Sequence, residues 1–227
     1  MCIREKDIIM KKIIKIIEEI VPKYSWIYLI AAVTINGISY FGLRLLITPS
    51  KYYDLSMPLD HKLPLLPVFI IPYFLAFAQW VVGYIIIARE SKAVCSRIMT
   101  GEIIAKIFCF FFFLFLPTTI SYRPDKVLGD DILSWMTSWL FRIDAPTNLF
   151  PSIHCLESYV VVRGALSCKK VGKPYIIIMA IFSVFVFAST VLLKQHFIVD
   201  FFGAVAVAEA GMFLARFVPF VKKAQEV

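Results

Sequence analysis

Residues 174–193 read PYIIIMAIFSVFVFASTVLL, a run of twenty residues without a charged side chain. The hydrocarbon core of a bilayer is about 30 Å thick, and an α-helix of about 20 residues crosses it. Because hydrocarbon offers no hydrogen-bonding partner, the backbone of such a run must bond to itself, as a helix does. The stretch therefore predicts a membrane-spanning helix, and it decides the fold class.

Apolar runs of the same kind recur along the chain. Six are predicted as spans, at residues 26–47, 67–88, 103–120, 154–166, 174–193 and 197–217. The fourth is short, because Glu157 and Arg163 flank its charge-free part. The chain is 60% hydrophobic with a mean hydropathy of +0.80, whereas a soluble domain is nearer half apolar. We expect an all-α polytopic membrane protein with a six-helix membrane domain over residues 26–220.

The basic residues predict how this domain is oriented. The net charge of +8 would fit a nucleic-acid binder, but the basic residues are spread between apolar runs, so we expect no nucleic-acid partner. Seventeen Lys and Arg residues fall on the side that carries both termini and seven on the other. Cytoplasmic loops carry the excess of basic residues, so both termini are expected to be cytoplasmic and all three histidines to face outward.

The two ends of the chain are predicted as cytoplasmic segments, 1–25 and 221–227. Residues 8–23 alternate apolar pairs with charges at helical spacing, which predicts an interfacial amphipathic helix. A plain charged flank before the first span is the alternative. Five cysteines show no paired spacing, so neither a disulfide framework nor a cysteine zinc site is expected.

His196 and Asp200 form the first candidate site. They lie four residues apart, so on a helix both project from nearly the same face. A carboxylate there can hold one imidazole nitrogen as donor and leave the other as nucleophile or base. A polar pair that meets the headgroups is one alternative, and a shared metal ion is another. No further ligands have a recognisable spacing, so we expect no metal and no cofactor.

His154 begins the fourth predicted span, after Pro151 and Ser152. Ser152 is a plausible N-cap, and the free amides with the positive dipole end of the helix make an anion site. His154 would stand beside that anion and could protonate a leaving oxygen. An ordinary capped helix start is the alternative. Two such motifs on one side of the membrane are a stronger signal than either alone.

These motifs resemble those of the type 2 phosphatidic acid phosphatase (PAP2) superfamily, which carries Lys-x6-Arg-Pro, Pro-Ser-Gly-His and Ser-Arg-x5-His-x3-Asp. The chain has Arg123-Pro124, Pro151-Ser152-Ile153-His154 and Ser189-Thr190-x5-His196-x3-Asp200 in the same order. The resemblance covers roughly residues 26–220. It implies that His196 attacks phosphorus to give a phosphohistidine, oriented by Asp200. It also implies that His154 protonates the leaving alcohol and that Arg123 and Ser152 hold phosphate oxygens, without a metal.

Three positions depart from the family pattern. Leu116 replaces the first-motif lysine, Ile153 the glycine and Thr190 the arginine, so two phosphate-binding cations are missing. Lys194 is the expected substitute, provided that its segment is a loop, and Arg142 and Lys126 on the same outer side are the other candidates. The stretch 144–154 resembles a PAP2 branch that includes inositol phosphorylceramide synthase-like phosphotransferases.

We therefore expect a phosphatase or phosphotransferase that acts on a lipid phosphate or diphosphate at the outer headgroup level of the bilayer. Catalytic roles fall to His196, His154 and Asp200, and phosphate binding to Arg123, Ser152 and Lys194. The alternative is a non-catalytic lipid-binding or transport protein on the same scaffold. A bacterial plasma membrane is expected, because the sequence shows no eukaryotic sorting signal. The sequence does not predict the oligomeric state.

Overall fold

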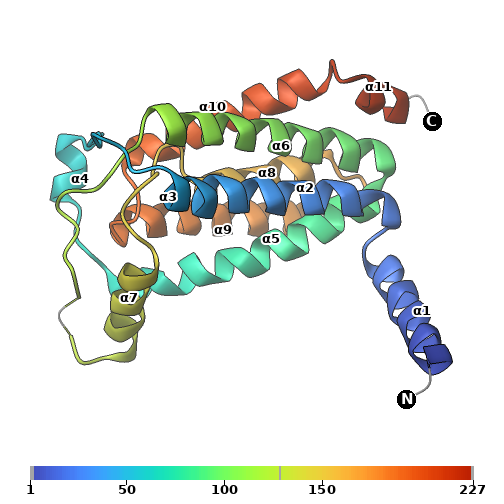
Figure 1. Cartoon of the computed structure of the whole chain (residues 1–227), viewed down its shortest axis with the longest axis horizontal. Helices are drawn as coiled ribbons and strands as arrows, with labels where there is room; N and C mark the ends of the chain where they lie inside the picture. Colours follow the sequence, from blue (N-terminus) through green and yellow to red (C-terminus); the bar gives the residue numbers. More distant parts are fainter. Residues whose placement is uncertain (1–2, 128, 226–227) are drawn as a thin grey trace.

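The computed structural model describes residues 3–127 and 129–225, and this part of the chain is helical without a β-strand. Figure 1 shows long helices side by side, with α1 leaving the bundle at one end. The bundle consists of α2 (Trp26–Gly37), continued by η2 (Ile38–Gly42) and α3 (Leu43–Leu46), with α5 (Ile70–Glu90), α6 (Lys92–Phe115), α8 (Ile153–Ser167), α9 (Lys173–Leu192) and α10 (Ile198–Ala215). The shorter elements are α1 (Ile3–Ile20), η1 (Lys23–Ser25), α4 (Pro58–Lys62), η3 (Pro67–Phe69), α7 (Ile132–Ile143) and α11 (Pro219–Gln225).

The predicted all-α fold is confirmed, and five helical segments in the described chain are long and apolar enough to cross a membrane. They are Lys23–Leu46, Pro67–Glu90, Lys92–Phe115, Lys173–Leu192 and Ile198–Ala215. The fourth predicted span, 154–166, corresponds to α8, which has 15 residues. At 1.5 Å per residue, α8 is about 22 Å long and falls short of a hydrocarbon core of about 30 Å. The predicted count of six spans therefore exceeds the five that length and composition support.

Helix α8 lies at the centre of the bundle. It packs against α5, α6, α9 and α10, and Cys155, Leu156, Val160 and Val161 on it are fully buried. Because α8 is surrounded mostly by protein rather than lipid, its buried polar residues Glu157 and Ser158 face partners on neighbouring helices.

Buried charges connect α8 to α6. Lys106 of α6 lies 2.6 Å from a carboxylate oxygen of Glu102 and 2.6 Å from one of Glu157 on α8. All three side chains are buried, and the hydroxyl of Tyr84 donates to Glu157. Lys106 is one of the seventeen basic residues counted for the side that carries the termini, but its charge is neutralised inside the bundle. It therefore carries no information about which side of the protein faces the cytoplasm.

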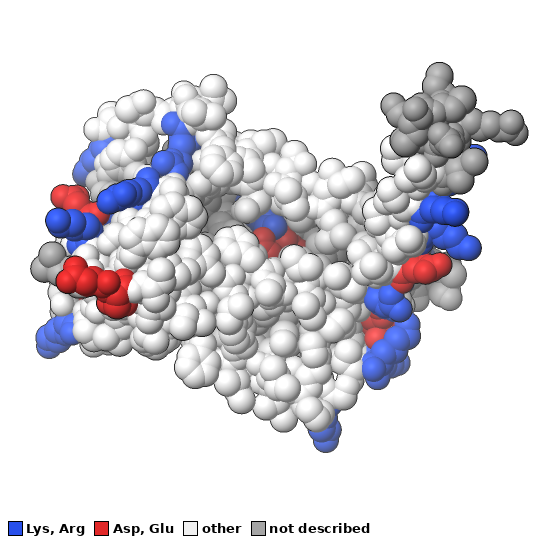
Figure 2. All heavy atoms as spheres, turned by 90° about the horizontal axis from the view of Figure 1, so that it is seen from below, with Lys and Arg blue, Asp and Glu red and all other residues white. Residues whose placement is uncertain are grey.

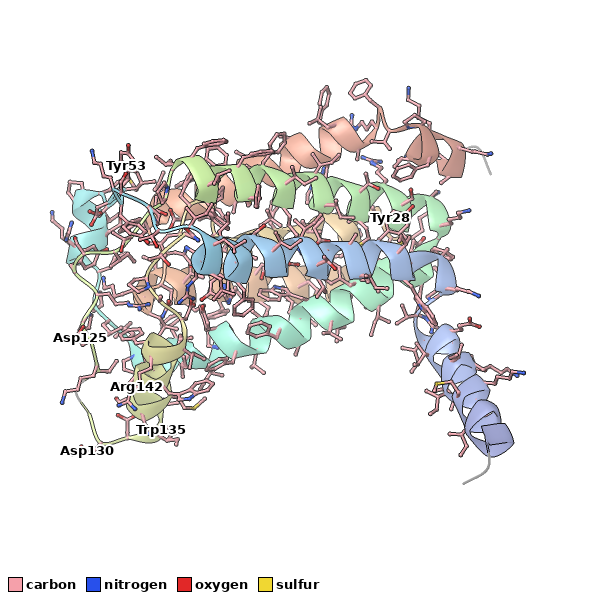
Figure 3. The ribbon with its side chains drawn as sticks, viewed as in Figure 1. Tyr28, Tyr53, Asp125, Asp130, Trp135 and Arg142 are labelled. Carbon is pink, nitrogen blue, oxygen red and sulfur yellow. The ribbon has the colours of Figure 1, made fainter. Side chains whose placement is uncertain are left out.

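Charged side chains otherwise gather at the two ends of the long axis. Figure 2 shows them there, with a broad uncharged band between the ends and a hollow in its middle where groups of both signs are recessed. In Figure 3, Tyr53, Asp125, Asp130 and Arg142 lie at the end that carries α4 and α7, while Tyr28 lies toward the other end. This distribution is typical of a protein whose middle lies in hydrocarbon.

The predicted terminal segments are helical where the structure describes them. Helix α1 carries exposed isoleucines, among them Ile9, Ile13 and Ile16, along with its lysines. Helix α11 covers most of the predicted tail. Residues 1 and 2 of the predicted N-terminal segment and residues 226 and 227 of the tail lie outside the described part.

Helices α6 and α10 approach each other closely at two glycines. A Cβ added to Gly211 would lie 2.2 Å from the carbonyl oxygen of Gly101, and one added to Gly101 would lie 2.9 Å from the Cα of Met212. Small residues allow this approach, which is a common way for helices to associate in membranes.

We predict that Gly211→Ala destabilises the protein by about 1–3 kcal/mol, because the backbone of α6 cannot yield to the added methyl group. Thermal unfolding in detergent measures the effect. Gly37→Ala in α2 is the matched control, since nothing lies within 4 Å of the added Cβ. Equal melting temperatures for the two variants would contradict the packing described here.

Candidate functional site

The two histidines meet at one end of the bundle. His154 is the second residue of α8, and His196 lies in the turn between α9 and α10. Their ring centroids are 6.3 Å apart. The backbone N–H of Ser152 donates to the carbonyl oxygen of Asp200 at 3.2 Å, which fixes one motif against the other. Both histidines line a cavity of about 430 Å³.

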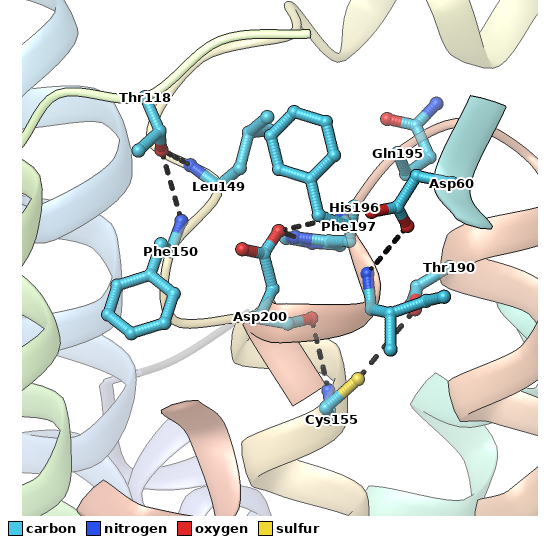
Figure 4. A network of polar contacts seen from close by, with 12 residues as sticks. Asp60, Thr118, Leu149, Phe150, Cys155, Thr190, Gln195, His196, Phe197 and Asp200 are labelled. Atoms are coloured by element: carbon cyan, nitrogen blue, oxygen red, sulfur yellow. Dashed lines mark hydrogen bonds and ion pairs between the residues drawn. The ribbon is translucent and has the colours of Figure 1, made fainter. Parts of the chain in front are cut away.

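Asp200 orients His196, as the sequence predicts. The Nδ1 atom of His196 lies 3.0 Å from Oδ2 of Asp200, and the same oxygen accepts the backbone N–H of Phe197 at 2.9 Å (Figure 4). Asp200 is 0% exposed. In the tautomer in which Nδ1 of His196 donates to the Asp200 carboxylate, Nε2 keeps its lone pair.

The reason for this contact differs from the predicted one. Helix α10 begins at Ile198, so His196 precedes it and the two residues do not share a helical face. Asp200 is the third residue of α10 and bonds back to the turn in front of the helix. Helix capping, rather than a helical stripe, therefore brings the carboxylate to His196.

Lys194 holds this turn in place. It adopts a left-handed backbone conformation, with φ of 55°. Its Nζ donates to the carbonyl oxygens of Asp60 at 3.0 Å and Leu63 at 2.7 Å, while Oδ1 of Asp60 accepts the N–H of Ile198 at 2.9 Å. Burial lowers the pKa of Lys194, although the Asp60 carboxylate opposes the shift. The segment is a loop, as the prediction required, but the ammonium binds the end of α4 and is not in the cavity wall.

Ser152 is the predicted N-cap of α8. Its Oγ accepts the N–H of Cys155 at 3.4 Å, and the residue is fully buried. Its side chain is not in the cavity wall, whereas Ile153 and His154 of the first helical turn are. The cavity is therefore faced at this point by the positive end of the α8 dipole rather than by the Ser152 hydroxyl.

Arg123 lies behind the cavity rather than in its wall. Its Nη2 donates to the carbonyl oxygen of Asp144 at 2.9 Å, and its guanidinium carbon lies 4.8 Å from the centre of the Phe141 ring. Its Nη1 donates to Oε1 of Gln195 at 3.0 Å. Burial lowers the pKa of Arg123, partly offset by Asp144. In the described chain no Lys or Arg lines the cavity.

Aromatic rings surround His154. Tyr73 stacks on it with centroids 4.3 Å apart, and Trp80 and Phe77 meet it edge-on at 5.2 and 5.8 Å. The Nε2 atom of His154 is buried and has no hydrogen-bond partner among the described residues. Positions 73, 77 and 80 follow helical spacing and form a recognisable aromatic stripe in the sequence. The sequence does not indicate which helix this stripe packs against.

The segment before α8 is held by Thr118. Its Oγ1 accepts the N–H groups of Leu149 at 2.8 Å and Phe150 at 3.1 Å (Figure 4). Its carbonyl oxygen accepts the backbone N–H of Asn148. Asp144 is a further cavity residue that sequence reasoning missed; its carboxylate accepts the hydroxyls of Tyr40 and Tyr73. These contacts join residues far apart in the chain, so no local signal reveals them.

No group of three or more His, Cys, Asp and Glu side chains within residues 3–127 and 129–225 is arranged to hold a metal ion. Comparison of the chain with family models, with curated proteins and with solved structures found no match. The geometry of the site therefore carries the functional argument.

Replacing Lys194 should destabilise the protein. We predict that Lys194→Met lowers the free energy of unfolding by about 1–3 kcal/mol, because one buried and one partly buried carbonyl oxygen lose their donor. Chemical denaturation in detergent measures the loss. The exposed Lys126 offers a matched control as Lys126→Met. A stability equal to that of the control would show that Lys194 does not hold the turn.

Proposed function

We propose that the chain is a membrane phosphatase or phosphotransferase of the PAP2 type that acts through a phosphohistidine. Nε2 of His196 attacks phosphorus, and the bond from phosphorus to the leaving oxygen breaks. Asp200 stabilises the positive charge that develops on the imidazole. His154, protonated when the substrate binds, gives its proton to the leaving oxygen. Water or an alcohol then attacks the phosphohistidine, releases His196, and returns a proton to His154.

The observation that carries this proposal is the arrangement of three side chains. A buried carboxylate orients His196, and a second imidazole with an unpartnered Nε2 faces the same cavity. Nucleophile, orienting group and acid are the parts that phosphoryl transfer through an enzyme-bound intermediate needs. Binding alone requires neither the oriented imidazole nor the second one.

The cavity fits a lipid phosphate or diphosphate. Its wall is formed largely by apolar and aromatic residues of η2, α5, α6 and α7. Its ionisable groups are the two histidines, Asp144 and two tyrosines, and α2 contributes Asn36. Helix α2 packs mainly against α6, so the space beside α5 is available to an acyl or prenyl chain from the bilayer. The positive end of α8 favours an anion at the histidines.

We further propose a six-helix bundle in which α8 is the sixth member. The backbone N–H of Lys170, just after α8, donates to the carboxylate of Glu90 at the end of α5. The backbone N–H of Ser152, just before α8, donates to the carbonyl oxygen of Asp200 in the first turn of α10. Helix α8 therefore reaches between the two ends of the bundle although it is short. Protein around its ends satisfies the backbone groups there. With both termini in the cytoplasm, the site faces outward, in a bacterial plasma membrane.

A second candidate function is non-catalytic lipid binding or transport. It is favoured by the absence of Lys and Arg from the described cavity wall, since stabilisation of charge is usually the largest contribution to phosphoryl transfer.

We predict metal-independent release of phosphate from phosphatidic acid, prenyl phosphates or prenyl diphosphates by the purified protein in detergent with EDTA. His196→Ala should abolish release, and Asp200→Asn should lower it by roughly 10²–10⁴-fold, as loss of a group that acts with the base does. Phosphate-labelled protein that is stable to base and labile to acid identifies the phosphohistidine.

Three outcomes would decide against the mechanism. Inhibition by EDTA would exclude it, and so would full activity in His196→Ala. Binding of a lipid phosphate without turnover, with or without a range of alcohols as acceptors, would favour the lipid-binding alternative.

The proposed orientation predicts opposite labelling of two exposed lysine positions. In a Cys2→Ser background, Lys126→Cys should react with a membrane-impermeant maleimide in intact cells, and Lys169→Cys only after lysis. The cysteines at positions 95, 109, 155 and 168 are buried and give a low background. The reverse pattern would place the site on the cytoplasmic side.

A further inference from the structure

Gln195 is a cavity residue at a variable position of the third motif, where the motif specifies no residue type. It lies between Lys194 and His196, is 2% exposed and lines the cavity with both histidines. Its backbone N–H donates to the carbonyl oxygen of Thr190 at 2.9 Å, within the turn that Lys194 holds. Its position is therefore fixed by the same contacts that position His196.

Arg123 determines which way the Gln195 amide points. The guanidinium can only donate, so the atom that lies 3.0 Å from Nη1 must be the amide oxygen. The amide nitrogen then points away from Arg123. This Nε2 is buried and has no hydrogen-bond partner among the described residues. An unpaired buried donor costs free energy, and here it belongs to a side chain in the wall beside the proposed nucleophile.

Resting on the proposed function, we propose that Nε2 of Gln195 donates a hydrogen bond to a non-bridging oxygen of the phosphoryl group as His196 attacks. Gln195 thereby supplies part of the charge stabilisation that the missing motif cations would give. Arg123 is a positioning residue: it fixes the amide and polarises its N–H groups toward the cavity without entering it. The positive charge of Arg123 thus stabilises the phosphate indirectly, by polarising the neutral Gln195 amide that donates to it.

The hydrogen bonds of Lys194 and Arg123 explain why neither cation binds the phosphoryl oxygen directly. The Lys194 ammonium is bound by two carbonyl oxygens of the α4 region. The Arg123 guanidinium is bound by the Asp144 carbonyl and by Gln195 itself. Gln195 is thus the group that links a buried cation to the cavity wall.

Orthovanadate, a phosphate analogue that can take five-coordinate geometry, provides a direct probe. Trp80 lies 5.2 Å from His154, so tryptophan fluorescence can follow binding to the full-length protein. Gln195→Met keeps the length of the side chain and removes the donor. We expect its affinity for vanadate to fall roughly tenfold to a hundredfold, as the loss of a hydrogen bond to a charged group predicts.

The matched control is Gln79→Met. Gln79 is a buried glutamine whose amide bonds Ser183 and Met179 outside the cavity. The Gln79→Met variant should be less stable than the wild type but bind vanadate with unchanged affinity. Gln195→Glu is a second test variant: its carboxylate can still pair with Arg123, so the fold is retained, but anion binding should be lost. Melting temperatures separate misfolding from loss of the donor.

A double-mutant cycle tests the role of Arg123. If Arg123 acts through Gln195, Arg123→Met should weaken vanadate binding in the wild-type background and have little further effect in Gln195→Met. Arg123→Lys should restore part of the affinity, because an ammonium can also donate to Oε1. Additive losses would show that Arg123 acts independently of Gln195 and would overturn this part.

Failure of this inference is distinguishable from failure of the proposed function. Wild-type vanadate affinity in Gln195→Met, with phosphate release still lost in His196→Ala, would overturn the role of Gln195 and leave the phosphohistidine mechanism standing. A wild-type protein that neither binds vanadate nor releases phosphate would overturn both.

Discussion

The turn at Lys194 is the constraint on which the rest of the site depends. Its left-handed backbone reverses the chain between α9 and α10, and its ammonium ties that reversal to the carbonyl oxygens at the end of α4. Gln195 and His196 follow directly, so one set of contacts fixes both side chains toward the cavity. Asp200 then needs only to cap α10 to reach His196. The motif comparison predicts that Lys194 binds phosphate, whereas in the structure Lys194 holds the turn that carries His196.

Buried charges elsewhere in the bundle are likewise bound by partners from other parts of the chain. Where hydrocarbon surrounds a protein, each polar group must find its partner within the protein. Lys106 lies between Glu102 and Glu157, and Tyr84 donates to the other carboxylate oxygen of Glu157. These contacts join α5, α6 and α8, and they let a short polar helix occupy the centre. Because α8 is central, its first turn can meet the turn before α10, and the two histidines can share one cavity.

Periodicity and composition were sufficient to predict the helical fold, because the length of an apolar run is a local property. The pairing of His196 with Asp200 and the N-cap at Ser152 were also predictable, since their partners lie within four residues. The contacts of Lys194 and Arg123 were not. Lys194 bonds residues more than 130 positions away, and Arg123 bonds one 72 positions away. Local spacing cannot report on such partners, and so the phosphate-binding set was the least predictable part of the site.

The two sides of the cavity are built differently, and this bears on what each can recognise. On the side of the histidines, loops from three parts of the chain are linked by hydrogen bonds: Thr118 holds the segment before α8, and Asp60 and Lys194 hold the turn before α10. Polar groups there are held in fixed positions, as selective recognition of a polar ligand requires. On the other side, aromatic and apolar side chains of η2, α5 and α7 provide non-directional contacts. Since non-directional burial depends on area rather than on shape, a lipid phosphate bound as proposed would be selected through its headgroup, with tolerance for the length of its chain.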